Sequence, residues 1–334
     1  MYAMFVTYER SVFRSVVQGI SFFLFFFSWI AWGCPVLAQT ESMGKITVPH
    51  IILEDYDGIR LSLPSRLFFD PFRREIYVID AGNNRILIYA HDFFPLMSVD
   101  VNAGIEFPIG MALDSKGNFF VTQSPTKKYP NGRLSVLNAS LRWKRDIMFE
   151  GFEGADKFIP RNIAFNKHDF LYVIGKEYPR VVVLDKDGKF SHLFPSVESF
   201  EDESRTVSIY DIEIDDAGRI YLLSEEIGRI YVYDTQEKFL MKFGQKGGGT
   251  GKLSRPRGLA VDNHNKRIYV VDYMRHTISV YSMEGEFLFE FGGLGWSKGW
   301  LQFPGDICVD REGNVLVADT FNNRVQVFKI VSLR

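Results

Sequence analysis

The chain has 334 residues, of which 46% are hydrophobic and 24% are charged, and its net charge is −2. This balance is that of a globular protein with a sizeable core. It argues against a protein that binds nucleic acid by neutralising phosphates, because that mode needs a basic excess. The aromatic content is high, with 31 Phe and 15 Tyr, and favours half-buried β-strands.

The first 38 residues have the pattern of a targeting segment. Arg10 and Arg14 precede an apolar stretch that ends in Val36-Leu37-Ala38, so we expect a signal peptide cleaved after Ala38. An uncleaved membrane anchor and a lipid attached to Cys34 are the alternatives, since about 20 apolar residues can span a bilayer. All three possibilities export the folded part. It would lie in the periplasm or outside the cell, or it would be anchored to a membrane through this segment alone, with the propeller on the outer side.

Cys34 belongs to that segment, so the folded part has a single thiol, Cys308. One cysteine excludes an intramolecular disulfide and a cysteine-based zinc site. Cys308 lies in an apolar run and is predicted to be a small buried residue.

Six repeats follow the N-terminal region. Each begins at a turn signal and carries Asp or Asn six residues later, and the beginnings lie 44 to 52 residues apart, at positions 64, 108, 160, 209, 256 and 304. A second apolar run follows in every repeat, and a third begins with Arg in five of the six. In three repeats the first two runs are separated by an Asp-x-x-Gly turn, at Asp114, Asp215 and Asp310, and such turns are typical of hairpins.

Four strands per repeat of this length predict the blades of a propeller. The predicted fold is therefore all-β: a six-bladed β-propeller of four-stranded antiparallel blades behind an N-terminal apolar targeting helix. The last repeat ends near Ile330 and lacks a fourth strand, which residues 46–54 are predicted to supply. The predicted organisation is a targeting segment at 1–38, a linker at 39–45 and a propeller at 46–334.

The last repeat resembles the NHL-repeat family. It contains Phe303-Pro304-Gly305-Asp306, then Gly313-Asn314, then Asn322-Asn323-Arg324-Val325. The fifth repeat is similar, the second to fourth are degenerate, and the resemblance covers about residues 63–330. It implies a propeller fold, whereas relatives of this type serve as scaffolds, sensors or enzymes, so it leaves the function open.

Residues just after the repeat starts are expected to rim one mouth of a central channel, and they form the candidate ligand site. They are Arg66, Arg161, Asn162, Asp211, Arg257 and Asp306. The three arginines would suit an anionic or carboxylate ligand. The alternative is that they pair with Asp211 and Asp306.

Other motifs carry less chemistry. Asp80 with Arg85 and Asp319 with Arg324 recur at the same spacing, as expected of structural pairs between strands. None of the six histidines is expected at the start of an inner strand, where the resemblance implies a metal would be held. Residues 245–252 depart from the P-loop pattern, and residues 123–132 and 198–203 are a basic and an acidic insertion.

The sequence favours a non-catalytic, monomeric binding or scaffold propeller, without catalytic residues or cofactor, for a protein partner or a small anionic ligand on its loop faces. The alternative is a lyase or lactone hydrolase with a divalent cation in the channel. A sensor is a third role.

Overall fold

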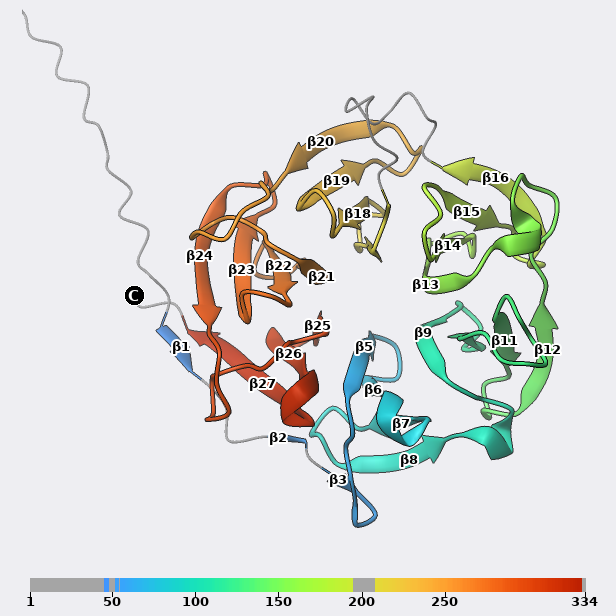
Figure 1. Cartoon of the computed structure of the whole chain (residues 1–334), viewed down its shortest axis with the longest axis horizontal. Coiled ribbons are helices and arrows are strands. Elements are labelled where there is room, and N and C mark those ends of the chain that lie inside the picture. Colours follow the sequence, from blue (N-terminus) through green and yellow to red (C-terminus); the bar gives the residue numbers. More distant parts are fainter. Residues whose placement is uncertain (1–44, 48–51, 54, 195–207, 332–334) are drawn as a thin grey trace, which may run out of the picture. The chain divides into compact units, whose positions relative to one another are not determined.

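The computed structural model describes residues 45–47, 52–53, 55–194 and 208–331. In this part of the chain six antiparallel sheets form the blades of a closed ring (Figure 1), and β3 (Asp55–Tyr56) and β4 (Ile59–Arg60) form a separate two-stranded sheet. Inner strands of successive sheets contact one another, and the last contacts the first. The predicted all-β, six-bladed architecture is confirmed.

The N-terminal targeting segment, residues 1–38, and the acidic insertion at 198–203 lie outside the described residues. Among the residues that the structure does describe, no helix has the length and apolar character needed to cross a membrane.

The first five blades have four strands each, in chain order from the channel outward. Blades 1 and 2 are β5 (Pro64–Asp70), β6 (Glu75–Asp80), β7 (Arg85–Tyr89) and β8 (Pro95–Val99), then β9 (Pro108–Leu113), β10 (Phe119–Gln123), β11 (Arg133–Leu137) and β12 (Trp143–Ile147). Blades 3 and 4 are β13 (Pro160–Phe165), β14 (Leu171–Gly175), β15 (Val181–Leu184) and β16 (Phe190–Phe194), then β17 (Asp211–Ile214), β18 (Ile220–Ser224), β19 (Arg229–Tyr233) and β20 (Phe239–Phe243). Blade 5 is β21 (Pro256–Asp262), β22 (Arg267–Asp272), β23 (Thr277–Ser282) and β24 (Phe287–Gly292).

Blade 6 takes strands from both ends of the described chain. Its inner three strands are β25 (Asp306–Val309), β26 (Asn314–Asp319) and β27 (Arg324–Val331). Two short strands, β1 (Lys45–Thr47) and β2 (Ile52–Leu53), pair with the outer edge of β27. They are the described residues of the stretch predicted to complete this blade. Their pairing with β27 joins the two ends of the ring.

The core consists of six apolar clusters, one between each pair of neighbouring blades. Side chains alternate between the two faces of a strand, and β6 shows the consequence. Ile76 and Val78 pack toward blade 6, whereas Tyr77 and Ile79 pack toward blade 2. Each sheet is therefore buried on both faces, and this burial explains the near-continuous apolar runs in the sequence.

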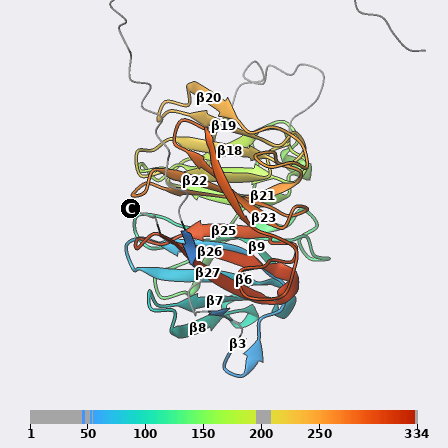
Figure 2. The ribbon, with the colours of Figure 1, turned by 90° about the vertical axis from the view of Figure 1, so that its left-hand side faces the viewer.

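The two faces of the ring carry different loops (Figure 2). The face on which the inner strands begin carries Pro64, Pro108, Pro160, Pro256 and Pro304, and we call it the proline face. The opposite, turn face carries the hairpins between first and second strands. There Asp114 accepts hydrogen bonds from the N–H groups of Lys116 and Asn118, and Gly117 has a φ of 73°, as the Asp-x-x-Gly pattern predicts.

Three residues on the proline face hold the next blade through side-chain acceptors. Asn84 accepts the N–H of Phe107, Asn323 accepts that of Leu63 at 2.9 Å, and His276 Nδ1 accepts that of Phe303 at 2.9 Å. Each acceptor lies in the loop before a third strand and has a left-handed backbone. We call these contacts the interblade clamps; His276 replaces the asparagine of the other two.

Candidate functional site

The register of the repeats divides the six predicted site residues into two layers. Counting from each repeat start, the third residue is Arg66, Asn162, Asp211 or Asp306 in four blades and glycine in the other two. The second residue is Arg161, Tyr210 or Arg257 in blades 3, 4 and 5. Successive strand residues point in different directions, so the two sets occupy different environments.

The third-position residues form a buried polar plug across the channel. Arg66 Nη1 donates to Asp211 Oδ1 at 2.7 Å and to Asp306 Oδ1 at 3.2 Å. Asn162 Nδ2 also donates to Asp211 Oδ1, at 2.7 Å. The remaining carboxylate oxygens accept backbone N–H groups, Leu259 for Asp211 and Leu67 for Asp306. This plug ties together blades 1, 3, 4, 5 and 6.

The plug is electrostatically tight. Burial disfavours the charged guanidinium of Arg66, but Asp211 and Asp306 outweigh burial and raise its pKa. Burial also raises the pKa of Asp306 to about 7, against the opposing effect of Arg66. One guanidinium faces two carboxyl groups, and a shared proton would relieve their repulsion. Arg66 is therefore used within the fold rather than available to a ligand.

Glycine occupies the third position in blades 2 and 5 because a side chain would not fit. A Cβ at Gly258 would lie 2.6 Å from Asp306 Oδ1, and one at Gly110 would lie 2.4 Å from the carbonyl oxygen of Arg161. The two glycines therefore let the inner strands approach closely enough for the plug to form.

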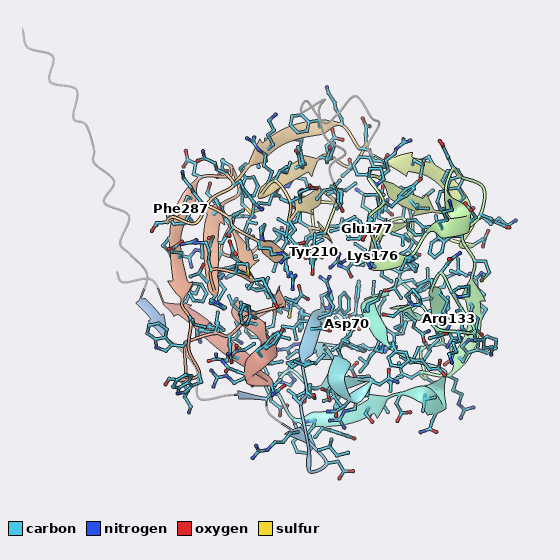
Figure 3. All side chains as sticks on the ribbon, viewed as in Figure 1. Asp70, Arg133, Lys176, Glu177, Tyr210 and Phe287 are labelled. Carbon is cyan, nitrogen blue, oxygen red and sulfur yellow. The ribbon has the colours of Figure 1, made fainter. Side chains whose placement is uncertain are left out.

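Above the plug, Tyr210 lies between two arginines. The Arg161 guanidinium carbon is 3.4 Å from the centre of the Tyr210 ring, and that of Arg257 is 5.6 Å away. Arg257 also lies 3.6 Å over the ring of Tyr273. Figure 3 shows Tyr210 close to the middle of the ring of blades. These four residues form what we call the arginine–tyrosine site.

The charges of this site are unbalanced. Arg257 and Arg255 each donate through Nε to the same oxygen of Glu225, both at 2.8 Å. Among the described residues, Arg161 has no salt-bridge partner, and its guanidinium contact is the Tyr210 ring. Burial lowers the pKa of Arg161, and the nearby Tyr210 opposes this lowering. The guanidinium still stays protonated at neutral pH. Three arginines thus face one carboxylate.

Below the plug, a cavity of about 880 Å³ runs along the inner strands to the turn face. Among its charged lining residues, acidic ones outnumber basic ones, and Glu213 lies in it half-buried. Burial raises the pKa of Glu213 well above its ordinary value. Cys308 also lines this cavity and is a buried free thiol, as predicted; burial raises its pKa.

In the described channel lining, few side chains of the kinds that bind metal ions lie together in one place. In the described ranges, no group of three or more His, Cys, Asp or Glu side chains could hold one. The two carboxyl groups at the inner end of the channel, Asp211 and Asp306, are both engaged by Arg66.

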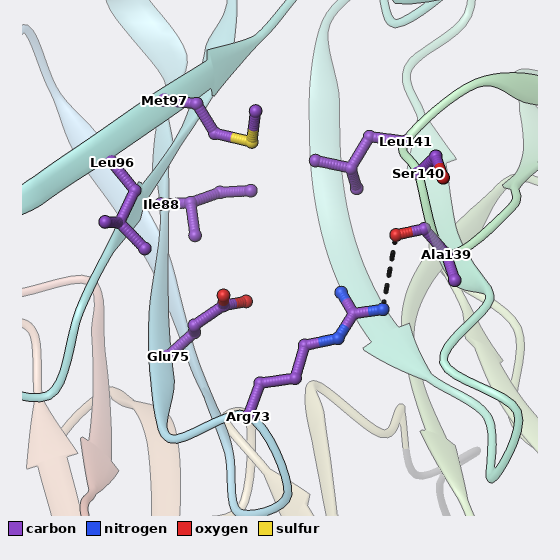
Figure 4. A pocket seen from close by; sticks show the side chains of 8 residues that line it. All are labelled: Arg73, Glu75, Ile88, Leu96, Met97, Ala139, Ser140 and Leu141. Carbon is purple, nitrogen blue, oxygen red and sulfur yellow. Dashed lines mark hydrogen bonds between the residues drawn. The ribbon is translucent and has the colours of Figure 1, made fainter.

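A smaller pocket of about 340 Å³ lies between blades 1 and 2 (Figure 4). Arg73 crosses it and donates to the carbonyl oxygens of Gly117 and Ala139, both at 3.3 Å. Glu75 accepts the hydroxyl of Tyr77 at 2.7 Å. Both charged groups of this pocket therefore have partners within the blades.

The other sequence motifs are structural. Arg85 donates to Asp80 and Arg324 donates to Asp319, each at 2.7 Å between buried side chains. The basic insertion at 123–132 is folded against its own blade, where Arg133 lies 4.3 Å over the ring of Tyr129.

Sequence reasoning missed Tyr210, Tyr273 and Glu225. A signal for each tyrosine was present. Tyr210 has the same repeat position as Arg161 and Arg257, and Tyr273 follows Asp272 at the end of a second strand, where blades 1 and 6 have the smaller Ala81 and Thr320. Glu225 follows Ser224 at the position that Tyr273 has after Asp272, but its role depends on arginines of the next blade.

Comparison with known proteins agrees with this fold. A family model described as a 6-bladed beta-propeller matches residues 177–292, and an NHL-repeat model matches residues 301–328. No curated protein matches significantly. The chain is therefore a six-bladed β-propeller, and its last blade contains an NHL repeat.

Several solved structures share the architecture at low sequence identity. A streptogramin B lyase is 12% identical, with a TM-score of 0.58 over 87% of this chain and 99% of that one. An auxiliary nutrient binding protein from Bacteroides thetaiotaomicron is 14% identical, with a TM-score of 0.64 over 86% and 77%. A virginiamycin B lyase from Staphylococcus aureus is 11% identical, with a TM-score of 0.55 over 79% and 80%. These similarities concern the fold alone.

Proposed function

We propose that this propeller is a non-catalytic binding module that holds an anionic, carboxylate-bearing ligand at the arginine–tyrosine site. The observation that carries the proposal is Arg161, a half-buried guanidinium stacked on Tyr210 without a carboxylate partner among the described residues. A charged group that is partly desolvated and unpaired is costly in the free protein. A ligand carboxylate would offset this cost through paired N–H···O bonds.

The site is preorganised for such a ligand. Tyr210 and Tyr273 hold the guanidinium planes by cation–π contacts, and Glu225 fixes Arg257 from the side. Rotamer entropy that is lost in the free protein is not lost again on binding. Because the plug lies beneath, the ligand would reach the site from the proline face.

Titration calorimetry with citrate, a small tricarboxylate, tests the proposal. We expect Arg161→Gln and Arg257→Gln to weaken citrate binding at least ten-fold, and higher salt to weaken it in the unchanged protein. Arg311→Gln is the matched control, because it removes the same charge from an exposed residue on the turn face. Equal losses in all three variants would mean a general charge effect and would reject the site.

We also propose that the propeller acts in the cell envelope, exported by residues 1–38. Cell fractionation with mass determination of the mature chain tests this proposal, and an intact chain in the cytoplasm would reject it. The enzyme alternative rests on the similarity in fold to the lyases. Metal analysis of the purified protein distinguishes the two functions, since a stoichiometric, tightly held divalent ion would favour the enzyme.

A further inference from the structure

Aromatic side chains continue the arginine–tyrosine site across the proline face. The rings of Tyr273 and Phe303 have centroids 4.9 Å apart, and Phe303 lies 5.0 Å from Phe321. Phe321 is 48% exposed. Tyr210, Tyr273, Phe303 and Phe321 therefore form a row from blade 4 to blade 6, which we call the aromatic track.

Further apolar side chains on this face are held outward at a cost. Leu63, Phe107 and Phe303 each precede the proline of an inner strand and have φ of 49°, 50° and 47°. A left-handed backbone is unfavourable for bulky residues and persists only where the surroundings impose it. The interblade clamps impose it here, and Leu63 and Phe107 remain 42% and 53% exposed.

The loop before blade 6 presents two tryptophans on a fixed backbone. Trp296 is 81% exposed and Trp300 is 50% exposed. Gln326 Nε2 and Arg324 Nη2 donate to the carbonyl oxygen of Trp300 at 2.7 and 3.1 Å, and Asn322 Nδ2 donates to that of Gly295 at 2.9 Å. Side chains of blade 6 thus hold the loop, while the indole of Trp296 stays largely in solvent and that of Trp300 is half exposed. Large exposed apolar groups on a rigid surface are typical of a protein interface.

The two ends of the track have different chemistry. At the blade 4 end, Arg255 and Arg257 share the carboxylate of Glu225, and Arg161 has no carboxylate partner among the described residues. At the blade 6 end, the large exposed side chains include Leu294, which is 62% exposed, and Trp296, with the exposed Lys298 beside them. Aliphatic and indole surfaces gain from burial against other apolar side chains, whereas the guanidinium end complements acidic ones.

We infer that the proline face binds an extended segment of a partner protein in which acidic side chains lie beside aromatic or aliphatic ones. The acidic residues contact the arginine–tyrosine site, and the apolar residues lie on Phe303, Phe321 and Trp296. This inference rests on the proposed anion site and names the class of its ligand. An acidic oligosaccharide would satisfy the guanidinium end but would bury Leu63 and Leu294 against hydroxyl groups.

Selection from a displayed library of random 12-residue peptides on the full-length chain tests the inference. We expect enriched peptides to combine Asp or Glu with Phe, Trp or Leu. Their binding should weaken at least ten-fold in Trp296→Ser and Phe321→Ser, and in Arg161→Gln. Phe72→Ser is the matched control, since Phe72 is 89% exposed on the turn face, and it should leave binding unchanged.

Three results would overturn the inference. They are the absence of enrichment, enrichment of peptides without acidic residues, and equal binding to the Trp296→Ser, Phe321→Ser and unchanged chains. Binding of oligogalacturonate, lost in the same variants, with no peptide enriched would replace the peptide by an acidic glycan. In each case the citrate titration with Arg161→Gln reports separately whether the anion site itself exists.

Discussion

His276 makes the clamp between blades 5 and 6 sensitive to acid, in contrast to the two asparagine clamps. Its Nδ1 accepts the N–H of Phe303 at 2.9 Å, and only an unprotonated ring nitrogen can accept. The side chain is buried, and burial lowers its pKa although Asp272 and Asp319 oppose this effect. The folded protein therefore resists a proton that the unfolded chain takes up freely.

The sign of the pH dependence follows from this difference. The pKa of His276 is lower in the folded than in the unfolded protein. Its contribution to the free energy of unfolding is therefore complete above the unfolded pKa, about 6.5, and is lost as the pH falls below that value. Between pH 7 and pH 5, His276 then costs at most about 2 kcal/mol. If it does become protonated in the folded state, the Phe303 N–H loses its acceptor, at a cost of about 1–3 kcal/mol.

Replacing His276 by Asn supplies an amide acceptor, as Asn84 and Asn323 do in the other clamps. Urea unfolding at pH 7 and pH 5 measures the effect. We expect His276→Asn to differ little from the unchanged protein at pH 7 and to be more stable by about 1–2 kcal/mol at pH 5. His264→Asn, at an exposed turn residue, is the control. If the stability gap of His276→Asn is the same at both pH values, the reasoning is wrong.

Three further outcomes follow from the plug and the channel. In urea unfolding, Arg66→Met should lower the free energy of unfolding by about 3–5 kcal/mol because it leaves two buried carboxyl groups uncompensated. Asp306→Asn should lower it less than Asp211→Asn does, since burial already favours neutral Asp306. The reverse order would contradict the plug. Gly258→Ala should cost about 1–3 kcal/mol through its clash with Asp306, and a neutral result would mean that the inner strands separate easily. Iodoacetamide should label Cys308 at least about 100-fold more slowly in the native than in the unfolded protein, because the thiol is buried and its raised pKa disfavours the thiolate. Peptide mapping measures the two rates, and equal rates would show an open channel.

The fold was predictable because its causes are local and repeated. Asp-x-x-Gly turns such as that at Asp114 set the first hairpin of three blades, and apolar runs such as that of β6 match sheets buried on both faces. Six copies of one pattern identify the architecture even where single copies are degenerate, since each blade needs only to bury itself against its neighbours.

The site was only partly predictable. The repeat register pointed to Arg66, Arg161 and Arg257 as a group, yet the structure uses Arg66 inside the plug and leaves Arg161 on Tyr210. Adjacent strand positions point in different directions, and the partner of each side chain comes from another blade, up to 240 residues away. Such pairings depend on how the ring closes.

The sequence by itself determined the number of blades, because apolar runs at a constant spacing, separated by turn residues, recur in all six repeats. Only the tertiary structure decided which charges cancel. Asp211 and Asp306 lie beside Arg66, and Tyr210 lies between Arg161 and Arg257, because ring closure brings inner strands from distant repeats into contact. Electrostatic pairing depends on distances of a few ångströms, and no single repeat contains that information.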